Sequence, residues 1–294
     1  MPLGGFTLSA NDISWLGEDL SRPECVLAQR DGMIWCSDDR GGVSRIGADG
    51  RGTVIGQVTG TPNGIALDRS GAILIANIGE GTVQRLHRDG RHETVLDALG
   101  GKPLGSVNFV YRDGARVWIT VSTRTEPMAE AVQQPIPDGY VMLLENGAAR
   151  IVADEICFTN EVRIDRARRH LYVAETARGR ILRFPLSADG SLGPRETYGP
   201  DGLCPGARVD GFAFDQEGNL WVTEISRNAI YVIAPDRSCH CVFEDPSARH
   251  VNFPTSLCFG GPDLKTVYIG SLRMKRLGVF RAPVAGEPME HWSE

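Results

Sequence analysis

The sequence predicts an all-β fold, a six-bladed β-propeller with four-stranded antiparallel blades, and three observations support this prediction. A short apolar strand that opens on a carboxylate or small polar residue, passes a glycine turn and enters a second strand recurs six times. The spacings between copies are 39, 45, 52, 50 and 45 residues, the period of a propeller blade. The 35 glycines and 17 prolines of this 294-residue chain fit many short strands joined by tight turns. The copies open at Glu24, Asn63, Asn108, Asn160, Asp210 and Thr255.

Each copy alternates strand patterns with turn residues, most clearly in the fifth. Residues 212–214, 220–223 and 230–233 are apolar runs, and polar or glycine-containing turns separate them. The fourth strands are shorter and more polar, as outer strands that face solvent should be. Because six copies account for nearly the whole chain, residues 1–294 are predicted to form one domain.

Closure of the ring is predicted to use both ends of the chain. The sixth copy shows three strands, at 256–259, 266–271 and 278–281, and then the chain reaches Glu294. An early segment, 6–9 or 12–16, reads as a strand without a blade of its own. We expect this segment to complete the last blade, because closure removes exposed sheet edges.

The third copy carries an insertion at residues 123–138, rich in Pro, Glu and Gln, between its second and third strands. Connections of this length in a compact domain are often functional. The second strand runs antiparallel to the first, so it ends on the side where first strands begin. We therefore expect the insertion to form a lid or wall over the central channel.

Composition excludes several classes of partner. The net charge is −6, and the 31 Lys and Arg residues form no basic stripe, which argues against nucleic acid. No apolar run approaches the roughly 20 residues of a membrane helix, and the N-terminus lacks the charged and apolar regions of a signal peptide. Buried reduced thiols and a cytoplasmic location are expected. We expect a small-molecule substrate, no membrane partner, and a monomer or weak homo-oligomer. The cysteines within apolar strands are Cys25, Cys36, Cys157 and Cys258.

The polar residues that open the six copies predict a binding site. In a propeller, the innermost strands all start at the same end of one channel, so these residues converge although they are far apart in sequence. Asn, Asp and Thr favour strand starts in any case, but Glu24 is a poor turn residue. Glu24 and Asp210 side by side without a counter-charge would repel each other. A divalent cation resolves this repulsion, with amide oxygens completing its shell.

An all-oxygen site indicates a hard cation. Ca²⁺ is the preferred candidate, with Mg²⁺, Mn²⁺ or Zn²⁺ as alternatives, although no histidine is in the ring. A few protein ligands would leave coordination positions open for water or substrate. The segment Cys239-His240-Cys241 offers softer ligands, but no second Cys/His pair lies at zinc-site spacing, and a surface strand is expected there.

The chain resembles the senescence marker protein/regucalcin/gluconolactonase family of six-bladed propellers over essentially its whole length. That resemblance implies one divalent metal held by Glu24, Asn160 and Asp210, with Asn108 beside it contacting substrate or water. It also implies hydrolysis of a lactone, typically a sugar-acid lactone. The matching segments are Arg22-Pro23-Glu24, Asn108, Asn160, the run 210–221, and 254–256 followed by 259–263.

The substrate pocket departs from the family pattern. Members that act on sugar lactones usually carry Arg two residues before the blade-three Asn and Asp directly after it. Here Ser106 and Phe109 occupy those positions, so the usual anchor for sugar hydroxyls is missing. We therefore expect a less hydroxylated lactone or an ester as substrate, with Ser106 among the substrate-binding residues.

Roles for the remaining residues follow as hypotheses. Asp210 is the candidate base that deprotonates water, and Asn108 and Asn63 would orient water or substrate. Other candidate substrate-binding residues lie near the proposed ligands along the chain: Arg22, Arg208, Phe158 and His250.

Two other functions use the same site. One is different metal-dependent chemistry, either organophosphate hydrolysis or a lyase step through a metal-bound enolate. The other is a non-catalytic propeller that binds Ca²⁺ or a ligand. Carboxylates with open coordination positions favour an enzyme.

Overall fold

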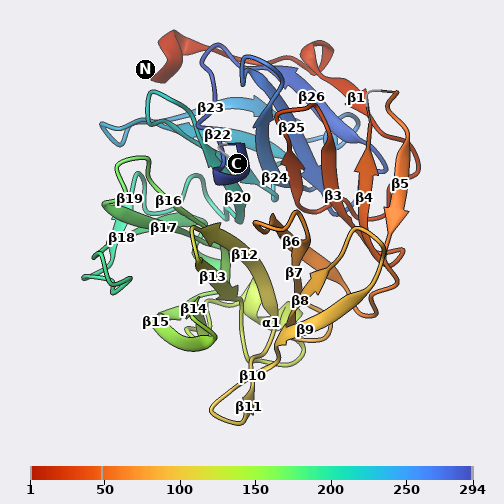
Figure 1. The fold of residues 1–294 in the computed structure, drawn as a ribbon. Coiled ribbons are helices and arrows are strands. Elements are labelled where there is room, and N and C mark those ends of the chain that lie inside the picture. The colour runs from red at the N-terminus through yellow and green to blue at the C-terminus, as the bar shows by residue number, and fades with distance from the viewer. Residues whose placement is uncertain (1, 48, 293–294) are drawn as a thin grey trace.

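A ring of six four-stranded antiparallel sheets surrounds one axis in the computed structural model, which describes residues 2–47 and 49–292 (Figure 1). Each sheet is one blade, and its strands follow one another from the axis to the rim. The predicted six-bladed propeller is therefore confirmed. Residues 1, 48 and 293–294, which the predicted domain also includes, lie outside the described residues.

The four strands of each blade occupy equivalent places. The inner strands are β2 (Val26–Ala28), β6 (Pro62–Leu67), β12 (Val107–Asp113), β16 (Thr159–Ile164), β20 (Val209–Phe214) and β24 (Pro254–Gly260). The second strands are β3 (Ile34–Asp38), β7 (Ile73–Asn77), β13 (Arg116–Val121), β17 (His170–Glu175), β21 (Leu220–Glu224) and β25 (Thr266–Ser271). The third strands are β4 (Gly42–Ile46), β8 (Thr82–Leu86), β14 (Gly139–Glu145), β18 (Arg180–Pro185), β22 (Ala229–Ile233) and β26 (Leu277–Arg281). The outer strands are β5 (Gly52–Ile55), β9 (His92–Leu96), β15 (Ala148–Ile156), β19 (Glu196–Tyr198), β23 (Cys239–Glu244) and β1 (Ser14–Leu16).

The N-terminal strand closes the ring. β1 pairs antiparallel with β26, with Ser14 opposite Val279 and Leu16 opposite Leu277. The segment 12–16, rather than 6–9, therefore supplies the missing outer strand of blade six. Phe6 instead packs the edge of its ring against Trp221, at 6.1 Å between centroids.

Apolar residues of the inner and second strands form the interfaces between blades. Trp35, Trp118 and Trp221 occupy equivalent second-strand positions and are fully buried. The four cysteines predicted to be buried are buried, and no cysteine of the described chain is in a disulfide. Cys239 and Cys241 lie on the outer strand β23 and are partly exposed.

Few segments are not strands. A small hairpin joins β10 (Ala98–Leu99) to β11 (Lys102–Pro103), and the insertion of blade three contains α1 (Met128–Gln133). Short 3₁₀ turns lie at Pro2–Gly5, Ala10–Asp12, Thr176–Arg178 and Glu290–Trp292. Within the described chain, none of the helices has the length and hydropathy that a membrane span requires.

The C-terminal segment crosses one end of the channel, near the axis (Figure 1). The indole nitrogen of Trp292 donates to the carbonyl of Ala28 in blade one, at 2.7 Å. The carboxylate of Glu290 accepts from the amide of Gly114 in blade three, at 2.7 Å. The amide of Glu287 donates to Phe214 in blade five. We call this end of the channel, where inner strands finish, the far end, and the end where inner strands begin the mouth.

Candidate metal centre

The inner strands of five blades have an irregular register near their first residues. The pairing shifts between Pro62 and Ile65, Val107 and Phe109, Thr159 and Val162, Val209 and Phe212, and Pro254 and Ser256. A bulge of this kind turns a side chain away from the ladder. The residues within these intervals include Asn63, Asn108, Asn160, Asp210 and Thr255, so the same local irregularity re-aims each polar opening residue.

Five of the six opening residues line one cavity of about 130 Å³ at the mouth. Asn63 is one of them, and the other four are Glu24, Asn108, Asn160 and Asp210, which lie on its wall although Glu24 and Asp210 are 186 positions apart. All four side chains are buried. The structure therefore brings together the three predicted metal ligands and the predicted catalytic neighbour. The other lining residues are Arg22, Ile78, Met128, Val132, Phe158, Thr176, Ile225, Phe253 and Leu272.

Unpartnered oxygen atoms indicate what this cavity is suited to bind. Glu24 Oε2, Asn108 Oδ1, Asn160 Oδ1 and Asp210 Oδ1 are buried and have no hydrogen-bond partner. A buried polar atom without a partner costs about 1–3 kcal/mol, and more when it is charged. Oxygen atoms of two carboxylates and two amides form a donor set that suits a hard divalent cation. The residues present therefore fit the cation that the sequence predicted.

The remaining polar atoms near these oxygens hold the ligands in place. The amide nitrogen of Asn63 donates to Glu24 Oε1 at 3.0 Å and to the carbonyl of Asn108 at 2.9 Å. Its amide oxygen accepts from Arg22 Nη2 at 2.6 Å. Asn63 thus links blades one, two and three, and its hydrogen-bonding capacity is used in positioning Glu24. Asn160 is oriented in the same way, because its amide nitrogen donates to the hydroxyl of Thr176 at 3.2 Å.

The two carboxyl groups of the centre have raised pKa values in the metal-free protein. Burial raises the pKa of Glu24 to about 8, against the opposing charge of Arg22 and with a further increase from Glu161. Burial raises the pKa of Asp210 well above its usual range, and the charges of Glu24 and Glu161 raise it further. Two buried acids that disfavour ionisation become stable as carboxylates when a cation lies between them.

Clusters of histidine, cysteine and carboxylate side chains are the other common kind of metal site in proteins. Among the residues that the structure describes, no group of three or more His, Cys, Asp or Glu could hold a metal ion. The candidate centre differs from such groups because amide oxygens supply half of its donors. Cys239 and Cys241 lie on one strand with His240 between them, and the ring nitrogen of His240 lies 3.1 Å from the carbonyl of Phe6.

Three bulky side chains on the cavity share an unusual backbone. Arg22, Phe158 and Phe253 have φ values of 52°, 61° and 59°, a region that L-residues with a β-carbon rarely adopt. Each lies two residues before the opening residue of its blade. Such conformations persist where the surrounding structure enforces them, often at functional sites. Here they place the guanidinium of Arg22 and the rings of Phe158 and Phe253 on the cavity wall.

The insertion of blade three covers the mouth, as the sequence predicted. Met128 and Val132 of α1 line the cavity, and Ala131 packs in a buried cluster with Cys157 and Phe158. Arg208 Nε donates to the carbonyl of Val132 at 3.0 Å, and Arg208 Nη2 donates to that of Gln133 at 3.4 Å. Arg208 therefore fastens the end of this helix to blade five.

Three residues predicted to bind substrate do not lie on the cavity. Arg208 is not among its lining residues, because its guanidinium turns toward backbone carbonyls of α1 and of its own loop. Ser106 is buried, and its amide and carbonyl pair with residues 123 and 122 of the neighbouring strand. His250 is about half exposed, and its ring nitrogen lies 3.8 Å from Asp245. Thr255, which the repeat placed in the lining, donates instead to the carbonyl of Glu24 at 2.7 Å.

Four residues that line the cavity were not predicted, although they occupy an equivalent position in four of the repeats. Ile78, Thr176, Ile225 and Leu272 each follow directly after the second strand of their blade, and all four line the cavity. An equivalent position in four repeats could have been found by aligning the repeats at the ends of their second strands. A third channel carboxylate, Glu161, was also missed, because it directly follows Asn160 within the bulge and breaks the alternation of the strand.

Comparison with known proteins agrees with this geometry. Residues 108–273, more than half of the chain, match the family described as the SMP-30/gluconolactonase/LRE-like region. The chain belongs to this family. Among curated relatives, 6-deoxy-6-sulfogluconolactonase of Pseudomonas putida is 30% identical over 193 residues. That alignment covers 63% of this chain and 62% of the relative, less than two thirds of its length.

Solved structures share the fold over nearly the whole chain. A gluconolactonase of Xanthomonas campestris, XC5397, superposes with a TM-score of 0.73 at 22% identity, covering 90% of this chain and 88% of that one. A calcium-binding protein of Agrobacterium tumefaciens, regucalcin, gives a TM-score of 0.75 at 18% identity, with 93% and 97% covered. At these identities the likeness shows the six-bladed architecture of this family member and nothing finer.

Proposed function

We propose that this protein hydrolyses a lactone with the help of one divalent cation held by Glu24, Asn160 and Asp210. The observation that carries the proposal is the set of four buried oxygen atoms without partners around one small cavity. The family supports the reaction class, because its similar members include proteins named as lactonases. The partner at this site would be a small molecule.

Ca²⁺ is the cation that we propose first. Its usual ligands are carboxylate and amide oxygens, and these are the donors present at the mouth. A structural neighbour named as a calcium-binding protein supports the same choice. Bound there, a divalent cation would polarise a carbonyl group and lower the pKa of a water molecule.

Side chains around the cavity would act as the base, orient the water or substrate, and hold the ligands in position. Asp210, buried and next to the cavity, would accept the proton of the attacking water at its carboxylate. Asn108 would orient water or substrate, because its amide oxygen faces the cavity without a partner. Asn63 would hold Glu24 in position through its amide nitrogen. Arg22 would in turn hold Asn63 and close one side of the cavity.

The wall of the cavity supports a substrate with few hydroxyl groups. Ile78, Met128, Val132, Phe158, Ile225, Phe253 and Leu272 make half of the lining. Ring hydroxyls of a sugar lactone would lose hydrogen bonds to water against these side chains without regaining them. We therefore propose an apolar lactone or related ester, small enough to fit beneath α1, as the preferred substrate.

A substrate panel after chelation tests this function. The protein is treated with EDTA and assayed on sugar lactones, alkyl-substituted lactones and simple esters, before and after adding Ca²⁺, Mn²⁺ or Zn²⁺. We expect cation-dependent opening of alkyl lactones, faster than that of sugar lactones. If no lactone is opened under any condition, the proposal is wrong, and turnover of an organophosphate or a lyase substrate would identify the alternative.

The variant Asp210→Asn distinguishes the role of Asp210 as a general base from its role as a cation ligand. It keeps an oxygen donor but cannot accept the proton at neutral pH. We expect weaker cation binding, measured by calorimetry, and, with the cation at saturating concentration, a loss of about 10²- to 10⁴-fold in turnover, the usual contribution of a general base. Full turnover with cation bound would show that another group takes the proton.

A further inference from the structure

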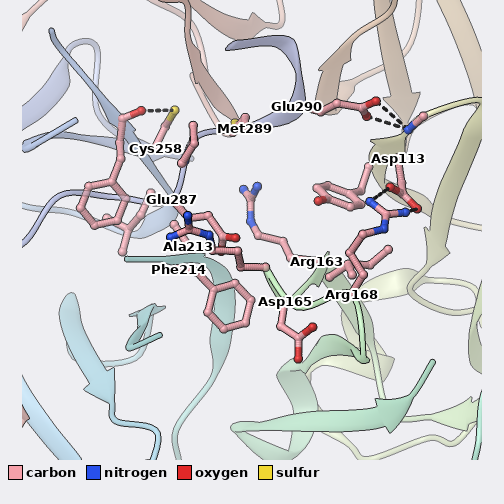
Figure 2. A pocket seen from close by; sticks show the side chains of 17 residues that line it. Asp113, Arg163, Asp165, Arg168, Ala213, Phe214, Cys258, Glu287, Met289 and Glu290 are labelled. Carbon is pink, nitrogen blue, oxygen red and sulfur yellow. Dashed lines mark hydrogen bonds and ion pairs between the residues drawn. The ribbon is translucent and has the colours of Figure 1, made fainter. Parts of the chain in front are cut away.

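A second cavity, of about 300 Å³, lies at the far end of the propeller axis (Figure 2). Arg163 extends into this cavity, and the Arg168–Asp113 ion pair and Glu290 lie at its rim. Arg163 is almost fully buried, so its charge requires a partner within the channel. That partner is Glu161, which lies between Arg163 and the mouth.

Glu161 and Arg163 together bind both backbone groups of one residue in the neighbouring blade. Arg163 Nη2 donates to Glu161 Oε2 at 3.0 Å. The amide of Phe212 donates to the same carboxylate oxygen at 3.3 Å, and Arg163 Nε donates to the carbonyl of Phe212. Phe212 lies two residues after Asp210 on β20, and Glu161 directly follows Asn160 on β16. The pair therefore connects the two strands that carry two of the proposed ligands.

This connection matters because no backbone ladder joins neighbouring blades. The strands β16 and β20 belong to different sheets, so side chains must set their relative position. Glu161 and Arg163 make that link within two residues of Asp210. A small shift of β20 would change the distance between the oxygens of Asn160 and Asp210, on which cation affinity depends.

The residue after Asp210 is fitted to Glu161. A β-carbon added to Gly211 would lie 2.4 Å from Glu161 Oε1 and 2.4 Å from the carbonyl of Thr255. Real β-carbons do not approach other atoms this closely, so only glycine allows β20 to lie against this carboxylate. The glycine at residue 211 is thus explained by close contacts with both Glu161 and the carbonyl of Thr255.

We propose that Glu161, held by Arg163, is a positioning residue of the cation site, fixing β20 against β16 beneath the ligands. This inference rests on the proposed cation site. Partners of metal ligands that are not ligands themselves commonly affect affinity strongly.

Calcium affinity of the chelator-treated full chain tests the inference by calorimetry, with Ca²⁺ alone as the probe. Glu161→Gln keeps the size of the side chain and an acceptor oxygen but removes the charge, and we expect its Kd for Ca²⁺ to rise about 10- to 100-fold. Gly211→Ala leaves every charge in place but sets a β-carbon against both Glu161 and the carbonyl of Thr255, and we expect a loss in the same direction. Arg163→Lys keeps the positive charge, and we expect a smaller loss than for Glu161→Gln.

Arg112→Met is the matched control. Arg112 is also a buried arginine that joins two blades, donating from Nε to the carbonyl of Leu67 at 2.7 Å, but it connects blades three and two further from the mouth. We expect this variant to lose thermal stability in EDTA while its Kd for Ca²⁺ stays within about twofold of the parent, since distant sites act independently.

The measured Kd values distinguish a wrong role for Glu161 from a wrong cation site. If Glu161→Gln and Gly211→Ala bind Ca²⁺ as the parent does, or lose no more affinity than Arg112→Met, Glu161 is not a positioning residue although the cation site stands. If the parent itself binds none of Ca²⁺, Mn²⁺ and Zn²⁺, the proposed cation site is wrong and this inference fails with it. Should Glu161→Gln not fold, Arg163→Lys carries the comparison, because it weakens the hold on the same carboxylate.

Discussion

The mouth and the far end of the channel are formed by the same six inner strands, but they differ in whether their charged side chains have partners. At the far end, Arg163 pairs with Glu161, and Arg168 pairs with Asp113. At the mouth, Glu24 Oε2 and Asp210 Oδ1 are buried without a hydrogen-bond partner, and in the described chain they are the only carboxylate oxygens in that state.

That contrast separates structural charge from functional charge. A buried ion pair whose hydrogen bonds are complete holds blades together and needs nothing further. Two buried acids with unused oxygens destabilise the fold unless something binds them. The unused carboxylate oxygens at one end of the channel are the physical reason to place the function at the mouth.

Replacing one glutamate by glutamine at each end of the channel gives the largest expected difference in turnover. Glu24→Gln removes a proposed ligand charge, and Glu287→Gln removes a half-buried carboxylate at the far end. A bound metal supplies several kcal/mol of transition-state stabilisation, and about 1.4 kcal/mol is a factor of ten in rate. We expect Glu24→Gln to lower cation-dependent lactone turnover by about 10³-fold, measured at saturating Ca²⁺.

Glu287→Gln is the control for that measurement, and its turnover should stay close to that of the parent. Equal losses in both variants would show that the two ends do not differ in function and would break the comparison.

The pH dependence of stability gives a smaller effect that sharpens the contrast. Burial raises the pKa of Glu24 to about 8 and that of Glu287 to about 7, from an ordinary 4.5. Between 4.5 and these values, the folded protein holds protons that the unfolded chain has released. Stability in EDTA should therefore fall as pH rises through this window. Ca²⁺ binds ionised carboxylates, so the increase in Tm that it causes should grow from about pH 5 to pH 8.

Thermal unfolding in EDTA and in Ca²⁺, followed across that pH range, checks this prediction. In Glu24→Gln the calcium-induced increase in Tm should be lost. In Glu287→Gln it should remain, on an EDTA profile that falls less steeply with pH. A calcium-induced increase that does not change with pH would contradict the assignment of Glu24 as a ligand.

The smallest expected effect concerns the cover of the mouth. Arg208→Ala removes the hydrogen bonds that fasten α1 to blade five. One such bond contributes about 0.5–1.5 kcal/mol, so we expect KM for the best lactone to rise about two- to tenfold, with kcat little changed. Arg168→Ala at the far end is the matched control and should leave KM unchanged, as steady-state kinetics of both variants will show.

Repetition explains why so much of the fold and of the ligand set could be predicted. The blade period and the alternation within each copy are local patterns, and equivalent positions in a ring must converge. The six opening residues were therefore recognisable from their places in the repeat, and the family resemblance singled out Glu24, Asn160 and Asp210 among them as ligands. Residues outside the repeat were harder to place. Arg208 and His250 precede the opening residues of their blades, but proximity in sequence does not decide which way a loop side chain turns.

The sequence by itself determined the propeller, its closure by an N-terminal strand, and the ring of polar residues at one end of the channel, because each follows from periodic local patterns. Only the tertiary structure decided which polar groups were already satisfied. Asn63 bonds to Glu24 across 39 residues of sequence, Arg163 to Phe212 across 49, and Trp292 to Ala28 across 264. Pairings over such separations depend on how whole blades pack, and they leave four oxygens of the candidate metal centre without partners.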